Sequence, residues 1–118
     1  MAREVAPRAA DYEVVMEGEA AAIRLAQKAC AEYRQAIAEN DRISVKRRTH
    51  LDRYFRAFCE HDDFYKRLNP EQFKREATLK DGLDGEVGIW AFKAPKMRIY
   101  GAILQVGGKR CFVGTRVD

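Results

Sequence analysis

Six basic residues near the C-terminal end of the sequence have the types and spacing to contact an anion. Between residues 88 and 117 the chain has six Lys or Arg residues and no Asp or Glu. They are Lys93, Lys96, Arg98, Lys109, Arg110 and Arg116. Most lie in or beside segments expected to be β-strands, so the sheet should present a cationic surface that suits a polyanion. Nucleic acid is therefore the first partner to consider.

Strand alternation singles out Arg98 within this group. In a strand Met97 and Ile99 point to one face, whereas Arg98 and Tyr100 point to the other. If the apolar pair faces the core, Arg98 lies outside it and calls for an anion. Tyr100 could stack on a base or share a proton, and Arg116, near the end of the neighbouring strand, could supply a second positive charge.

These cations suit RNA cleavage without a metal. The transition state puts additional negative charge on the phosphorane, which fixed Arg and Lys donors stabilise. Lys93, Lys96, Arg98 and Arg116 could form such a cluster. The alternative is that they only keep an exposed sheet face soluble, and the sequence leaves both interpretations open.

A second basic group is expected on a helix. It comprises Arg42, Lys46, Arg47, Arg48, Arg53 and Arg56. The group is either a solvated helix surface or a groove for phosphate or for an acidic segment of a partner. The two histidines, His50 and His61, have charged neighbours and no second ligand set at metal spacing, so they are interpreted as surface residues.

Cofactor and metal motifs are not indicated. Cys30, Cys59 and Cys111 are odd in number and widely spaced, which favours neither disulfides nor zinc and is typical of a reducing cytoplasm. The stretch 107–109, Gly-Gly-Lys, fails as a phosphate-binding loop because Arg110 stands where Ser or Thr is needed. We find neither a signal peptide nor an apolar run long enough to span a bilayer, so no membrane association is expected.

The chain of 118 residues is expected to form one domain. Residues 1–11 are predicted to be a flexible leader and residues 12–118 a single α+β domain. Residues 1–40 carry five Lys or Arg and seven Asp or Glu, a balance of −2, so the basic character belongs to the remainder.

The element order follows from hydrophobic periodicity and turn residues. A strand is predicted over residues 12–16, a helix over 17–38, a second helix ending near residue 59, and a short third helix over 69–79. Three strands over 89–93, 97–104 and 111–116 should form an antiparallel meander, with Gly107 and Gly108 at its last turn. The expected fold is α+β: an N-terminal strand, a helical hairpin and a short third helix packed on a C-terminal three-stranded antiparallel sheet.

The order of these elements resembles the RelE/ParE toxin superfamily, including its HigB-like members. The residues that carry the resemblance are Leu-Lys-Asp-Gly-Leu at 79–83, Trp90, Met-Arg-Ile-Tyr at 97–100, and Phe-Val-Gly-Thr-Arg at 112–116. The resemblance implies a RelE-like fold and a toxin that cuts messenger RNA on the ribosome without a metal or other cofactor. It also implies an antitoxin protein that covers the basic groove.

By this resemblance Arg98 matches the central-strand arginine and Arg116 the basic position that closes the last strand. The predicted catalytic residues are Lys96, Arg98, Tyr100 and Arg116, and the predicted RNA-binding residues are Arg47, Arg48, Lys93, Lys109 and Arg110. Two other functions stay open: a non-catalytic binding module of a phage or mobile element, and a ParE-like inhibitor of gyrase. The sequence does not indicate the oligomeric state.

Overall fold

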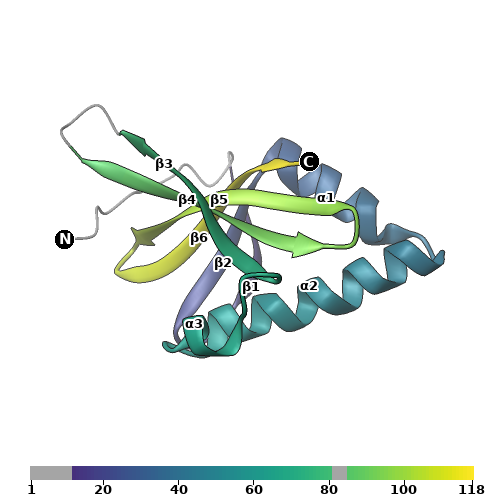
Figure 1. Cartoon of the computed structure of the whole chain (residues 1–118), viewed down its shortest axis with the longest axis horizontal. Coiled ribbons are helices and arrows are strands. Elements are labelled where there is room, and N and C mark those ends of the chain that lie inside the picture. The colour runs from purple at the N-terminus through teal and green to yellow at the C-terminus, as the bar shows by residue number, and fades with distance from the viewer. Residues whose placement is uncertain (1–11, 81–84) are drawn as a thin grey trace.

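A mixed β-sheet with helices on one face makes up the computed structural model, which describes residues 12–80 and 85–118 (Figure 1). The strands are β1 (Tyr12–Glu17), β2 (Ala21–Ala26), β3 (Phe73–Lys80), β4 (Glu86–Ala94), β5 (Met97–Val106) and β6 (Lys109–Val117). The helices are α1 (Gln27–Ala38), α2 (Arg42–Glu60) and α3 (Phe64–Arg67). The six strands lie in the order β1-β2-β6-β5-β4-β3, and only β2 and β6 pair in parallel.

The α+β class is confirmed, and so are several of the predicted elements. The strand over residues 12–16 is β1, the second helix is α2, and the C-terminal meander is β4-β5-β6. Asp41 begins α2 by accepting hydrogen bonds from the backbone N–H groups of Ile43 and Ser44. The sheet, however, has six strands, so the predicted three-stranded sheet is only its C-terminal half.

The predicted helix over residues 17–38 is wrong in its first half. Residues Ala21–Ala26 form β2, and the helix begins only at Gln27. Ile23 and Leu25 are fully buried, and Ile23 pairs with Phe112 of β6. Pairing with β6, more than 80 residues away, therefore makes this segment a strand. The local spacing of apolar residues cannot reveal such a distant partner.

The predicted third helix over residues 69–79 is also wrong. Its start signal is real, because Asn69 Oδ1 accepts from the Glu71 N–H and Gln72 Oε1 accepts from the Asn69 N–H. The turn stops after Gln72, and β3 begins at Phe73, which pairs with Phe92 of β4. The expected break at Asp81 and Gly82 lies outside the described residues.

Helices α1 and α2 cover one face of the sheet, α1 over β2 and β6 and α2 over β2 and β4 (Figure 1). Aromatic side chains fill the layer between α2 and the strands. The Phe58 ring centroid lies 5.8 Å from that of Phe73, 6.0 Å from Phe92 and 6.4 Å from Phe112. Phe58 thus joins α2 to three different strands.

Among the helices of residues 12–80 and 85–118, none combines the length and apolar character needed to cross a membrane. The three cysteines are free and buried. Desolvation is the first cause that raises the pKa of each thiol, and it raises the pKa of Cys59 from 9.0 to about 12. These thiols are therefore protonated at neutral pH.

We expect Phe58→Ala to lower the free energy of unfolding by about 3–5 kcal/mol, because it opens a cavity where α2 meets the sheet. Val45→Ala on the exposed side of the same helix is the matched control and should stay within about 0.5 kcal/mol of wild type. Urea denaturation followed by far-ultraviolet circular dichroism measures both. Equal small losses would mean that Phe58 does not anchor α2.

Alkaline pH should destabilise the protein through Cys59. The pKa of its thiol is higher in the folded than in the unfolded state, so the stabilisation is complete below pH 9.0 and is lost as the pH rises toward about 12. Denaturation curves between pH 8 and 11 should therefore show a steeper loss of stability for wild type than for Cys59→Ala. Identical slopes would contradict the shifted pKa.

Candidate nucleic-acid interface

Arg47 joins α2 to the turn between β4 and β5. Its Nε donates to the Pro95 carbonyl at 2.8 Å, and one terminal nitrogen donates to the Lys96 carbonyl at 3.2 Å. Lys96 has a φ of 53°, the left-handed conformation that this tight turn requires. Arg47 was predicted to bind RNA. The structure instead places its guanidinium on backbone carbonyls, where it fixes the distance between the helix and the hairpin.

A polar cleft of about 450 Å³ lies between these two elements. His50 and Tyr54 of α2 line one wall, and Lys93, Pro95 and Arg98 of the β4–β5 hairpin line the other. Residues 69, 71 and 72, which lead into β3, close it. The cleft therefore combines an imidazole, a phenol, two cations and the carboxylate of Glu71 from distant parts of the sequence.

The two cations in the cleft differ in their surroundings. Lys93 is largely buried and its Nζ forms an ion pair with Glu76 Oε1 at 3.0 Å, a contact that lowers the pKa of Glu76. Arg98 is exposed, and its backbone pairs with that of Asp118 through two hydrogen bonds of 2.9 Å. Among the described residues, no hydrogen bond or ion pair engages the Arg98 guanidinium, although its charge contributes, after that of Lys93, to the lowered pKa of Glu76. Arg98 is thus the cation most available to an incoming anion.

His50 is the functional candidate that sequence reasoning missed. It was interpreted as a surface residue, yet it lies in the cleft wall with its ring centroid 5.9 Å from that of Tyr54. Lys46 and Arg53 stand four residues before and three after His50, so they lie on the same side of α2. The spacing of Lys46, His50 and Arg53 on one helix side is visible in the sequence. The cleft beside them forms only through tertiary packing.

Tyr100 and Arg116 line a second hollow, of about 410 Å³, together with Ile89 and Glu76. A bulge between Tyr100 and Gly101 sets Tyr100 opposite Arg116, and the Arg116 guanidinium lies 5.6 Å from the Tyr100 ring centroid. Arg116 also pairs with Asp118 at 3.3 Å. The Glu76 ion pair with Lys93 stands between this hollow and the cleft, so the predicted catalytic residues divide into two neighbouring groups.

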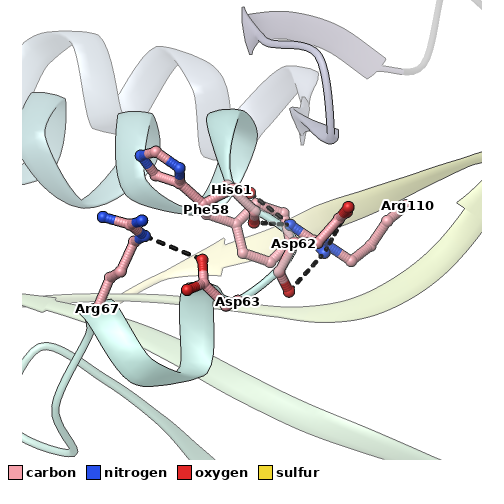
Figure 2. Close-up of polar contacts among 6 residues, drawn as sticks. All are labelled: Phe58, His61, Asp62, Asp63, Arg67 and Arg110. Carbon is pink, nitrogen blue, oxygen red and sulfur yellow. Dashed lines mark hydrogen bonds and ion pairs between the residues drawn. The ribbon is translucent and has the colours of Figure 1, made fainter.

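Arg110, another predicted RNA contact, is occupied inside the protein (Figure 2). One terminal nitrogen donates to the carbonyls of Phe58 at 2.6 Å and His61 at 2.9 Å, at the C-terminal end of α2. Its guanidinium lies 4.7 Å from the Phe58 ring centroid and 4.4 Å from that of Phe64. Burial lowers the pKa of Arg110. These contacts give Arg110 a structural role.

The two remaining predicted RNA contacts are also partnered. Arg48 donates to the Ile37 carbonyl at 2.6 Å and so satisfies the end of α1. Lys109 Nζ lies 3.3 Å from Glu17 Oε2, which joins β6 to β1. Of the residues predicted to contact RNA, Lys93 alone lies in the cleft, and Lys96 of the predicted catalytic set borders it.

Comparison with models of protein families, with curated proteins and with solved structures gave no match. The resemblance to the RelE/ParE superfamily therefore stays a prediction from the sequence. Within residues 12–80 and 85–118 no group of His, Cys, Asp and Glu side chains is arranged to hold a metal ion. Among the described residues, the side chains of the cleft are therefore the main candidates for function.

We expect Arg110→Ala to lower the free energy of unfolding by about 2–3 kcal/mol, because two carbonyls at the end of α2 lose a charged donor. Arg67→Ala is the control, since Arg67 makes one exposed ion pair with Asp63 (Figure 2) and should cost at most about 0.5 kcal/mol. Thermal denaturation distinguishes the two. A fully stable Arg110→Ala variant with weakened RNA binding would instead restore Arg110 to the interface.

Proposed function

We propose that this protein is a toxin-like endoribonuclease that holds a single RNA strand in the cleft between α2 and the β4–β5 hairpin. The observation that carries the proposal is the convergence of His50, Lys93 and Arg98 on one open cleft. By the sequence resemblance, its substrate is messenger RNA on the ribosome, and an antitoxin protein holds it inactive.

Charge around the cleft supports a phosphate backbone as the ligand. Lys46 and Arg53 flank His50 on α2, and Lys96 lies next to Pro95 at the turn opposite. Such a track of cations suits the regularly spaced phosphates of a nucleic acid strand. Arg98 can bind one phosphate through two parallel hydrogen bonds, which lysine cannot do.

The cleft has the groups that metal-independent cleavage needs. In this reaction the ribose 2′-oxygen attacks phosphorus, the bond from phosphorus to the 5′-oxygen breaks, and a 2′,3′-cyclic phosphate forms. His50 accepts the proton of the 2′-hydroxyl, and the leaving 5′-oxygen takes a proton from water in the open cleft. Arg98 and Lys93 stabilise the additional charge on the non-bridging oxygens. Tyr100 and Arg116 lie next to the cleft, where they would hold a flanking nucleotide.

Induced expression of the wild-type chain should arrest growth and leave new 5′-hydroxyl RNA ends. His50→Ala removes the proton acceptor and Arg98→Ala removes the phosphate ligand, so each should slow cleavage at least about a hundredfold and relieve the arrest. Arg56→Ala is the control, because this exposed residue of α2 pairs with Asp52 away from the cleft. Mapping of cellular RNA ends, with denaturation curves to verify folding, provides the measurement.

The outcomes separate the competing functions. Harmless wild-type expression with retained RNA binding would favour the non-catalytic binding module. Growth arrest with intact RNA and inhibited DNA supercoiling would favour a gyrase inhibitor. Cleavage that persists in both His50→Ala and Arg98→Ala would place the reaction elsewhere and overturn the assigned site.

A further inference from the structure

Another pocket, of about 380 Å³, lies beside the cleft, and four of its eight described lining residues are aromatic. Its walls include Phe64 and Tyr65 of α3, Phe73 of β3 and Trp90 of β4. The proposed cleavage chemistry does not use any of these residues. The pocket therefore calls for its own explanation.

Two stacked rings form the floor of this aromatic pocket. The Phe73 and Trp90 rings stack with centroids 5.0 Å apart and an interplanar angle of 17°. Phe73 is 5% exposed and belongs to the main core, which holds the stack in place. The Arg110 guanidinium contacts Phe64, 4.4 Å from its ring centroid. A flat ligand that enters the pocket meets a surface that is already ordered.

Tyr65 stands at the rim of the pocket and is 64% exposed, the largest value among the exposed large hydrophobic residues of the described chain. Its ring centroid lies 5.9 Å from that of Phe64, at an interplanar angle of 85°. An exposed aromatic ring beside an ordered aromatic floor provides surfaces on which a planar group can stack. Contact of the apolar Tyr65 ring with water is unfavourable, and a ligand that covers the ring would remove that contact.

Cations complete the pocket. Lys74 and Arg75 line it and are exposed, and Arg75 is oriented by a hydrogen bond of 2.8 Å to Thr78 Oγ1. None of its described lining residues is acidic. Aromatic surfaces with adjacent cations match a nucleotide, in which a planar base is attached to an anionic phosphate.

The aromatic pocket and the cleft share one segment of chain. Asn69 and Gln72 face the cleft, whereas Pro70 and Phe73 face the pocket. Neighbouring residues of this segment thus line both sites, which puts the two within reach of one nucleic acid strand. We propose that the aromatic pocket binds one unpaired base of the RNA strand whose phosphates occupy the cleft. This inference rests on the proposed RNA substrate and adds a reason to require single-stranded RNA.

Trp90 is the sole tryptophan of the chain, so its fluorescence reports on the pocket directly. The full-length protein is titrated with 2′-O-methyl hexaadenylate, which cannot be cleaved through the 2′-oxygen, and with inorganic polyphosphate of matched charge. We expect saturable quenching by the oligonucleotide and none by polyphosphate. Tyr65→Ala should weaken binding by about tenfold, whereas Tyr65→Phe, which keeps the stacking surface, should bind like wild type.

The design separates failure of this inference from failure of the proposed function. Anisotropy of a labelled oligonucleotide that shows binding without Trp90 quenching would overturn the base pocket and leave the cleft intact. Quenching that persists in a chain without nuclease activity would retain the base pocket and overturn the enzyme. Equal quenching by polyphosphate would show that the pocket responds to charge alone and would also overturn the base pocket.

Discussion

The contact of Phe58 with phenylalanines from three strands is the interaction on which the rest of the structure depends. It fixes the position of α2 over the sheet, because one ring packs against Phe73, Phe92 and Phe112 at once. Helix α2 also carries His50 and Tyr54, so the same contact sets one wall of the cleft. The candidate site is therefore a product of core packing and not of a local motif.

Several arginines in this protein donate hydrogen bonds to backbone carbonyls and are not simply surface charges. Arg48 satisfies a carbonyl at the end of α1, Arg110 satisfies carbonyls at the end of α2, and Arg47 joins α2 to the β4–β5 turn. Neither α1 nor α2 has a basic residue in its own last turn, so residues from elsewhere supply the positive charge there. A count of positive charges consequently overstates the number of cations that are available to a polyanion. Because Arg47, Arg48 and Arg110 donate to backbone carbonyls, Arg98 gains importance as a candidate contact.

The sequence predicted the elements that depend on nearby residues. The capping residue Asp41 and the apolar spacing of α2 are local, and so is the Gly107–Gly108 turn of the meander. Strands β2 and β3 were missed because their conformation depends on partners elsewhere, β6 for Ile23 and β4 for Phe73. For the site, alternation correctly placed Arg98 outside the core, whereas His50 acquires its neighbours only when the hairpin packs on α2.

The parallel pairing of β2 with β6 has a consequence for synthesis. Residues 21–25 cannot complete their hydrogen bonds until residues 110–114 exist, so the centre of the sheet closes only after β6 has left the ribosome. Pairing across such a long stretch of chain is slow, and loop closure must precede it. A nascent chain that has not yet exposed residues 110–114 would thus lack the central pairing of the sheet beneath α2. The topology delays the assembly of the cleft until translation of these strands is complete.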